Sequence, residues 1–468
     1  MNKTKKYQLP HTLVIIFSIV VIIALLTHFI PGGSYDRIEK DGRTIVIGDS
    51  FHYVKSQPQG LGALLMAPFR GFVEAAQIIA FVIIVGGAFS VIQSTGAIDG
   101  AIRSISAAHS QSRLLQSLMI PLLMTIFALA GAIFGMSEEV IPFILVFIPL
   151  ALSLGYDSIV GTAIPFLGAG AGFAGAFINP FTIGIAQGIA ELPPVSGIFY
   201  RIFCWVIITG LAIVFVSRYA AKIRSQPELS PTFEMDQQKR KQQPALVAND
   251  PKITTGHLLV LISFGMALIL LVVGVLKFGW YIPEIAALFF GASIIAGAAA
   301  RLKPSKMAES FVNGTKDMMN ALLIIAFARG ILVIASDGQI IDTILNALSS
   351  QITRFHPIFA GQAMFLVQTF INFFIPSGSG QAALTMPIMA PLSDLIGVTR
   401  QTAVLAFQFG DGFSNMIIPT SGVTMAVLGM GKIPWEKWAK WLLPLMLLFV
   451  LIGLILLIPP VIFHWGPF

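Results

Sequence analysis

Two adjacent glutamates, Glu138 and Glu139, lie in the stretch IFGMSEEVI, between apolar runs long enough to enter a lipid bilayer. A charged side chain at the bilayer centre costs about 3 kcal/mol or more on insertion scales, so such residues are rare and usually functional. A carboxylate at that depth can bind a cationic group or a proton. The turn that also contains Ser137 is therefore a candidate binding site.

A second turn of similar character, PSGSGQ, joins another pair of apolar runs. It contains no charge, but it offers hydroxyl groups and flexible backbone, which are suited to hydrogen bonding with a small solute. The candidate residues in this turn are Ser377, Gly378 and Ser379.

Two glycine-rich segments follow the two turns, one from Gly168 to Pro180 and one from Gly410 to Gly422. Gly and Pro unwind a membrane helix and free backbone N–H and C=O groups, which survive at that depth only where they line a cavity or a solute. We therefore expect each segment to break a helix beside a binding site. The polar residues in the two segments are Asn179, Asp411, Ser414, Asn415 and Thr420.

Charge indicates what kind of solute such a site would take. The ends of broken helices attract anions at their N-termini, whereas free carbonyls attract cations, so Na⁺ could bind near Asn179 and Asn415. The three acids of these segments outnumber Arg329, a basic residue within a predicted span, which favours a cationic or zwitterionic solute. Arg329 is either a structural counter-ion to Asp411 or to a glutamate, or a ligand for a substrate carboxylate.

The depth of the first turn has two interpretations. If both flanking runs cross the membrane, GMSEE is an ordinary turn in water, and its glutamates carry little meaning. Pro142 and Pro149 in the second arm, together with the matching Ser/Gly turn in the other half, favour a re-entrant hairpin.

The composition places these segments in an integral membrane protein. Of the 468 residues 56% are hydrophobic and only 11% are charged, whereas a soluble domain carries about 25% charged residues. Apolar runs of about 20 residues recur along the chain, which predicts an all-α, polytopic membrane protein. The net charge of +7 reflects basic loops beside these runs, so we expect no nucleic acid partner.

The two halves of the chain resemble each other at a spacing of roughly 240 residues, as in many transporters. The run from His11 matches the run from His257, and GAGFAGAFINP matches GDGFSNMIIP. We predict two inverted-topology repeats with about nine transmembrane helices, two re-entrant hairpins and two broken helices. The predicted parts are repeat 1 at 1–217 (hairpin 115–155, broken helix 157–187), a poorly ordered cytoplasmic linker at 218–256, and repeat 2 at 257–468 (hairpin 358–396, broken helix 400–430).

An additional span at 281–300 in the second half turns that half upside down relative to the first, where a polar loop runs from Asp36 to Gln57. Most of the 29 Lys and Arg residues then fall on one side, which the positive-inside rule identifies as the cytoplasm. The N-terminus is predicted to be cytoplasmic, and its first apolar run is read as a retained span.

The motifs FGMSEEVIPF, GAGAGFAGAFINPF and FGDGFSNMIIPTSG resemble the YfcC-type branch of the C4-dicarboxylate anaerobic carrier (DcuC) family, within the ion transporter superfamily. The resemblance covers nearly the whole chain, and this branch includes arginine/ornithine antiporters. It implies a homodimer in a bacterial plasma membrane, with a scaffold and a moving part in which hairpins and broken helices bind the solute. It places at or near the site the polar residues of the two turns and the two glycine-rich segments named above.

These features predict a secondary active transporter of amino acids, basic ones such as arginine or ornithine, working by exchange or by coupling to H⁺ or Na⁺ in an elevator-like motion. The alternative is a proton- or sodium-coupled carrier of C4-dicarboxylates or other carboxylates. An intramembrane enzyme would require a paired nucleophile and base or a metal-ligand set, and the sequence shows neither, so we expect no catalytic residues and no cofactor. A channel is a third possibility.

Overall fold

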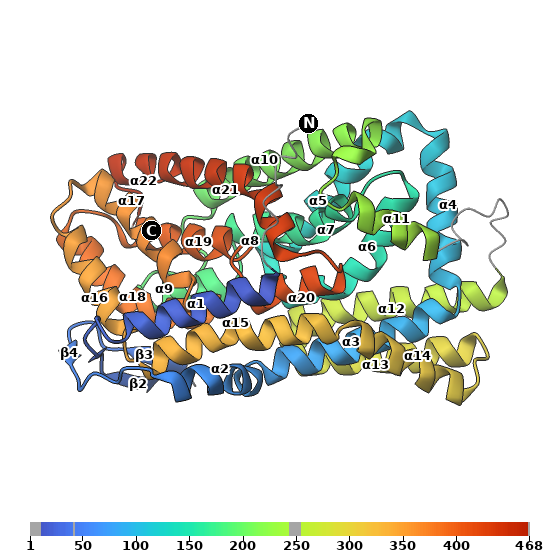
Figure 1. The fold of residues 1–468 in the computed structure, drawn as a ribbon. Helices are drawn as coiled ribbons and strands as arrows, with labels where there is room; N and C mark the ends of the chain where they lie inside the picture. Colours follow the sequence, from blue (N-terminus) through green and yellow to red (C-terminus); the bar gives the residue numbers. More distant parts are fainter. Residues whose placement is uncertain (1–10, 41–42, 243–253, 467–468) are drawn as a thin grey trace, which may run out of the picture.

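The protein is almost entirely helical in a computed structural model that describes residues 11–40, 43–242 and 254–466 (Figure 1). Seven helices in this part of the chain are long and apolar enough to cross a membrane. They are Ala76–Ser94, Gln116–Phe134, Ile198–Ser225, Thr255–Val275, Ile282–Ala299, Met319–Asp337 and Trp435–Ile462. Thr12–Leu26 and Ser158–Ala174 are shorter apolar helices. The all-α class is thus confirmed, whereas the count of about nine spans stays a prediction.

Four short strands lie in the polar segment after the first helix. Strand β1 (Gly33–Ser34) pairs antiparallel with β4 (His52–Tyr53), and β2 (Arg37–Lys40) pairs antiparallel with β3 (Arg43–Val46). This segment was predicted only as a polar loop. The strands form at one end of the molecule, where Arg37 also makes an ion pair of 2.7 Å with Asp342.

Apart from α13, which has no counterpart in the first half, the helices of the two halves follow the same order. The first half contains α1 (Thr12–Leu26), α2 (Leu61–Glu74), α3 (Ala76–Ser94), α4 (Ala97–Gln111), α5 (Arg113–Phe134), a 3-10 turn (Glu138–Val140), α6 (Ile141–Ser153), α7 (Ser158–Thr162), a π-helical segment (Ala163–Leu167), α8 (Gly168–Ala174), a second π-helical segment (Pro180–Gly184), α9 (Ile185–Ile189) and α10 (Ile198–Ser225). The second contains α12 (Thr255–Phe278), α13 (Ile282–Ala299), α14 (Pro304–Asp317), α15 (Met319–Asp337), α16 (Ile341–Ile352), α17 (Pro357–Asn372), α18 (Gly378–Leu395), α19 (Arg400–Ser414), α20 (Gly422–Met430), α21 (Trp435–Leu456) and α22 (Ile458–Ile462). This shared order is what an internal repeat requires, although the inverted repeat and its domain limits stay predictions.

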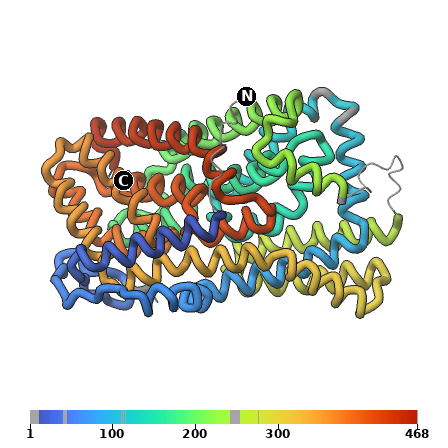
Figure 2. The backbone as a smooth tube through the Cα atoms, viewed as in Figure 1, coloured from blue at the N-terminus to red at the C-terminus, as the bar shows by residue number. Residues whose placement is uncertain are grey.

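One layer of the molecule is formed by α1 to α3 and α12 to α15, which lie along the lower side of Figures 1 and 2. We call it the scaffold layer. Helix α2 packs against α15, and α3 against α14. Glycines allow this close approach, because a Cβ at Gly71 would lie 2.2 Å from the carbonyl oxygen of Ala326. Helices α3 and α15 were predicted from the sequence, whereas α2 and α14, which lead into them, were not.

The other layer contains the two helical hairpins and the two broken helices, and we call it the hairpin layer. Hairpin α5–α6 lies in the half of Figure 1 that carries α4, whereas hairpin α17–α18 lies in the half that carries the strands. The observed helix pairs have the residue ranges of the predicted hairpins 115–155 and 358–396 to within three residues, whereas their re-entrant character stays a prediction. The two hairpins therefore approach the middle of the molecule from opposite ends.

The first predicted break was too long. Residues Gly168–Ala174 form helix α8, and only residues 175–179 are non-helical before the next helical turn at Pro180. The glycines in α8 serve packing instead, because a Cβ at Gly172 would lie 1.9 Å from the carbonyl oxygen of Ala128 on α5.

The second observed break is also shorter than predicted, because its first residues continue a helix. Helix α19 continues to Ser414, so that Gly410 and Asp411 are helical and the unwound segment spans only residues 415–421. A Cβ at Gly412 would lie 2.3 Å from the Cα atom of Ala174 on α8. These glycines therefore bring the two broken helices into contact with each other.

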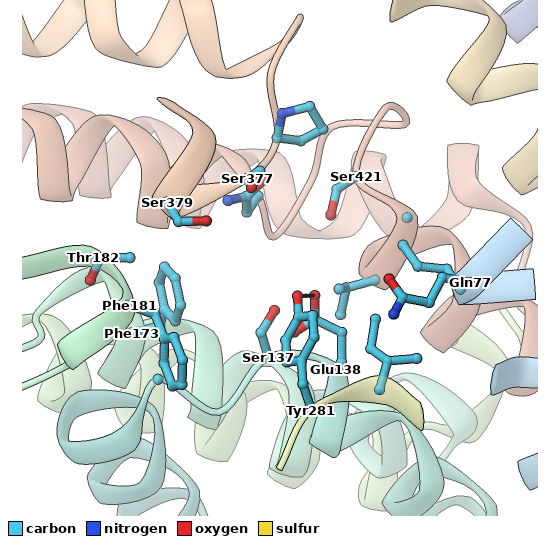
Figure 3. Close-up of a pocket in the computed structure, with 18 of the residues that line it drawn as sticks. Gln77, Ser137, Glu138, Phe173, Phe181, Thr182, Tyr281, Ser377, Ser379 and Ser421 are labelled. Atoms are coloured by element: carbon cyan, nitrogen blue, oxygen red, sulfur yellow. Dashed lines mark hydrogen bonds between the residues drawn. The ribbon is translucent and has the colours of Figure 1, made fainter. Parts of the chain in front are cut away.

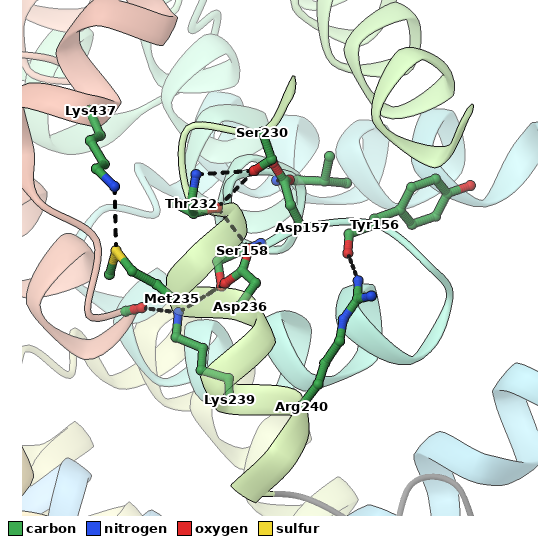
Figure 4. Close-up of polar contacts among 12 residues, drawn as sticks. Tyr156, Asp157, Ser158, Ser230, Thr232, Met235, Asp236, Lys239, Arg240 and Lys437 are labelled. Carbon is green, nitrogen blue, oxygen red and sulfur yellow. Dashed lines mark hydrogen bonds and ion pairs between the residues drawn. The ribbon is translucent and has the colours of Figure 1, made fainter. Parts of the chain in front are cut away.

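The prediction of a poorly ordered linker at 218–256 was wrong for its first part, whereas residues 243–253 lie outside the described residues. Helix α10 runs to Ser225, and a 3-10 turn (Pro227–Leu229) and helix α11 (Phe233–Gln242) follow. Figure 4 shows that α11 is attached to the hairpin layer by a buried polar network. We call residues 226–242 the linker helix segment.

The network of the linker helix segment is centred on Asp236, which is only 3% exposed. Its carboxylate accepts hydrogen bonds from the backbone N–H and the hydroxyl of Ser158 at the start of α7, and it makes an ion pair of 3.4 Å with Lys239. The Lys239 ammonium also donates to the carbonyl of Gly431, after α20. Burial lowers the pKa of Lys239, against the opposing effect of Asp236. The segment thus joins the ends of both broken helices.

Candidate substrate-binding site

A cavity of about 340 Å³ lies where the tips of the two hairpins meet the two broken helices and the scaffold layer (Figure 3). Small-molecule sites are usually concave and of about 300–1,000 Å³. Its polar lining residues are Glu74, Gln77, Ser137, Glu138, Glu139, Thr182, Tyr281, Arg329, Ser377, Ser379, Asn415 and Ser421, and its aromatic residues include Phe173 and Phe181.

The two glutamates of the first tip have different environments. Glu139 is only 4% exposed, and its Oε2 accepts a hydrogen bond of 2.9 Å from the backbone N–H of Ser137, so it folds the turn onto itself. The Oε1 atom of Glu138 accepts a hydrogen bond of 3.1 Å from the hydroxyl of Tyr281 in the scaffold layer (Figure 3). Glu138 is therefore the carboxylate presented across the cavity.

The shape of the first tip depends on a glycine and an asparagine. Gly135 has a φ of +73°, and a Cβ there would lie 2.6 Å from Oδ1 of Asn179. The same Oδ1 atom accepts a hydrogen bond of 2.9 Å from the N–H of Phe181 and so caps the helical turn after the first break. Asn179 thus supports the site from behind the cavity wall.

The second tip presents the N-terminus of a helix. Ser377 is the N-cap of α18, and its side chain accepts from the N–H of Gly380. Ser421 is the N-cap of α20 in the second unwound segment and lines the same cavity. The first N–H groups of a helix have no partner within the helix and carry partial positive charge, which favours an anionic group. The cavity therefore has an acidic tip on one side and two helix N-termini on the other (Figure 3).

Asp411 lies directly behind the second tip, within the hairpin layer, and does not line the cavity. It is fully buried, its Oδ1 accepts a hydrogen bond of 2.8 Å from the side-chain amide of Asn415, and its Oδ2 has no hydrogen-bond partner within the described residues. A Cβ at Gly378 would lie 3.0 Å from Oδ2. Asp411 was predicted to lie at or near the site; the structure places it behind the cavity wall, because α19 stays helical through this residue, and its part in binding stays a prediction.

The structure separates the predicted site residues into two groups. Those at the cavity wall are Ser137, Glu138, Glu139, Ser377, Gly378, Ser379 and Asn415, and those behind it are Asn179, Asp411, Ser414 and Thr420. Ser414 has a structural role, since its hydroxyl donates to the carbonyl of Gly410 at 2.6 Å and accepts from the amide of Asn372 at 2.7 Å.

Arg329 lines the cavity from α15 in the scaffold layer. Within the described residues it makes no ion pair with Asp411 or with either glutamate of the first tip, so the counter-ion interpretation finds no support for these three acids. Its position at the wall instead agrees with the interpretation that it faces a solute.

Apart from Arg329, the residues that the scaffold layer contributes to the cavity were not predicted from the sequence. Glu74 lies immediately before a predicted span, at the junction of α2 and α3, and Tyr281 begins the additional span of the second half. An acid and a tyrosine at the ends of apolar runs are weak signals, because such positions usually face water or lipid headgroups. Gln77, Thr182 and Ser421 were missed as well.

Several buried oxygen atoms near the second tip have no hydrogen-bond partner within the described residues. They include Asp411 Oδ2, Asn415 Oδ1 and Thr420 Oγ1. Oxygen ligands of this kind suit a hard cation. The predicted Na⁺ site near Asn415 is compatible with these donors, and a proton on Asp411 would use the same oxygen. No group of three His, Cys, Asp or Glu residues suited to a metal ion occurs in the described part of the chain.

Comparison with known proteins identifies close relatives of the whole chain. A protein of Escherichia coli strain K12, provisionally named as the basic amino acid antiporter YfcC, is 38% identical over 93% of this chain and 92% of its own length. An uncharacterized protein of Haemophilus influenzae Rd is 27% identical over 98% of both chains.

Two solved structures align over nearly the whole chain at lower similarity. The YdaH transporter of Alcanivorax borkumensis is 16% identical with a TM-score of 0.43, covering 98% of this chain and all of its own. MtrF of Neisseria gonorrhoeae is 18% identical with a TM-score of 0.42, covering 98% of this chain and 96% of its own. The family model for the C4-dicarboxylate anaerobic carrier matches residues 9–461. With this match over nearly its full length, the chain belongs to the C4-dicarboxylate anaerobic carrier family, which is a family of membrane transporters.

Proposed function

We propose that this protein is a secondary active transporter of amino acids that exchanges basic ones such as arginine or ornithine, or carries them coupled to H⁺ or Na⁺. The observation that carries the proposal is the polarity of the cavity. Glu138 lies on one side, and the N-termini of α18 and α20 lie on the other. A basic amino acid has a cationic side chain and a carboxylate, which fit these two sides.

The bound solute would lie with its guanidinium or ammonium group at Glu138 and its carboxylate at the hydroxyls and N–H groups near Ser377, Ser379 and Ser421. The name of the Escherichia coli relative supports this substrate class. Gly378 has no side chain, which leaves room for Thr182 and Asp411 against the second tip.

The two-layer arrangement supports an elevator-like motion, in which the hairpin layer moves along the scaffold layer with the solute. Both hairpin tips and both unwound segments belong to the hairpin layer, so one moving body would carry nearly the complete site. We further propose that the protein is a homodimer in a bacterial plasma membrane with a cytoplasmic N-terminus.

A carboxylate carrier is the second candidate, and one observation favours it. Two helix N-termini and Arg329 face the cavity, so a dicarboxylate with a coupling cation could also bind. The match to the family model agrees with this reading. The acidic tip counts against it, since a dianion would be repelled by Glu138.

Reconstituted protein in liposomes would decide between the candidates. Vesicles loaded with unlabelled arginine should take up labelled arginine and ornithine, whereas vesicles loaded with succinate should take up no labelled succinate. Each assay should be run with and without a sodium gradient and a proton gradient. Saturable succinate uptake without arginine uptake would contradict the proposal, and non-saturable flux without acceleration by internal solute would indicate a channel.

A further inference from the structure

We propose that Tyr281 couples substrate binding to translocation, by holding Glu138 of the first tip through a hydrogen bond that a cationic substrate weakens. This inference rests on the proposed function and adds to it the reason why exchange would be faster than net transport. It concerns a residue of the scaffold layer that no sequence motif identified.

The backbone of Tyr281 is held firmly at the start of α13. Its N–H donates a hydrogen bond of 3.0 Å to Oε2 of Glu284, the third residue of the helix, in a capping box. The preceding Trp280 packs on Gly274 of α12, where a Cβ would lie 2.1 Å from the indole ring. The Tyr281 hydroxyl is therefore projected into the cavity from a fixed point of the scaffold layer.

Glu138 reaches Tyr281 from the opposite layer. It lies in the turn between α5 and α6, at the tip of a hairpin, and its Oε1 is 3.1 Å from the tyrosine hydroxyl. The neighbouring Glu139 is turned back onto the N–H of Ser137, so the contact with the scaffold is made through Glu138. One hydrogen bond thus links the proposed cation-binding carboxylate to the part of the protein that stays in place.

An elevator-like displacement must break this hydrogen bond, because its two ends lie on layers that move apart. A hydrogen bond to a charged group changes an equilibrium or a rate by about 10- to 100-fold. The bond would slow the crossing of the carrier without substrate by a factor of this order.

A substrate cation on Glu138 changes that balance. The guanidinium or ammonium group neutralises the carboxylate and takes some of its acceptor positions, so the tyrosine hydroxyl is held less tightly. The loaded carrier would then cross faster than the unloaded one, which is the kinetic condition for exchange.

The test compares Tyr281→Phe with the wild type in proteoliposomes loaded with labelled arginine. Efflux is measured into buffer with unlabelled arginine, which reports exchange, and into buffer without it, which reports net transport. The variant keeps the ring and loses the hydroxyl. We expect the ratio of net efflux to exchange to rise by about 10-fold or more.

Tyr200→Phe is the matched control, because its hydroxyl donates a hydrogen bond of 2.6 Å to the carbonyl of Leu456, between α10 and α21 and outside the residues that line the cavity. It should leave the ratio of exchange to net efflux unchanged. An unchanged ratio in Tyr281→Phe, or loss of both activities in a correctly inserted variant, would overturn the role of Tyr281. Failure of the wild type to transport any basic amino acid would instead overturn the proposed function.

Discussion

The carboxylate of Asp411 lies directly behind Gly378 at the N-terminus of α18, where a Cβ would be 3.0 Å from Oδ2. The same Cβ would lie 2.4 Å from Cγ2 of Thr182, beyond the first break. Elements from both halves of the chain therefore meet at this glycine. Thr182 lies at the cavity wall beside it, and Asp411 lies behind the wall.

Replacement of Gly378 by alanine should reduce transport by at least about 10-fold, because the added methyl group must displace Thr182 or the tip of α18. Transport by the purified variant in proteoliposomes would measure this. Gly188→Ala is the control, since a Cβ at that position on α9 meets no atom within 4 Å. Equal loss in both variants would show that the effect is not local to the tip.

Replacement of Asp411 by asparagine should abolish coupled transport while the protein still inserts. The variant keeps the size of the side chain but removes the charge from a fully buried group whose Oδ2 has no partner within the described residues. Asp394→Asn is the control, because Asp394 lies in an exposed ion pair with Arg400. Uptake at the wild-type rate by Asp411→Asn would remove this residue from the mechanism.

The two glutamates of the first tip should respond differently to replacement by glutamine. Glu138→Gln should raise the KM for arginine by about 10- to 100-fold, since a charge-assisted hydrogen bond is lost. Glu139→Gln should change KM by less than about 3-fold, because its amide oxygen can still accept from the N–H of Ser137. Initial rates over a range of arginine concentrations would give both values, and equal KM values in the two variants would contradict the assignment.

Replacement of Asp236 by alanine should release the linker helix segment from the hairpin layer. The change leaves the buried N–H of Ser158 without its acceptor and removes the ion pair of Lys239, which keeps its hydrogen bond to the carbonyl of Gly431, at a cost of about 1–3 kcal/mol. Cleavage by trypsin within this segment should accelerate by about 5-fold or more. Gln238→Ala, on the exposed side of the same helix, should leave the rate unchanged.

The sequence alone predicted the helical membrane class, both hairpins and the position of both breaks to within a turn or two. These features depend on local patterns, namely long apolar runs and the Gly and Pro residues that interrupt them. The acidic tip was recognisable for the same reason, because two adjacent carboxylates between apolar runs are costly wherever the chain folds.

Only the tertiary structure decided what individual glycines and polar residues do. Gly172 and Gly412 were predicted to break helices, but they allow helices to pack against each other. Asp411 was predicted as a binding residue, but it is buried behind the cavity wall. The linker helix segment looked disordered by composition, yet Asp236 docks it onto α7.

Apart from Arg329, the contribution of the scaffold layer to the cavity was not visible in the sequence. Tyr281 and Glu138 are separated by more than a hundred positions, and nothing in either local sequence indicates that their side chains meet. Hydropathy and turn chemistry act over a few residues, and they determine which segments form helices and where these end. Which side chains face one another across a cavity depends on how the helices pack, and that is a property of the whole chain.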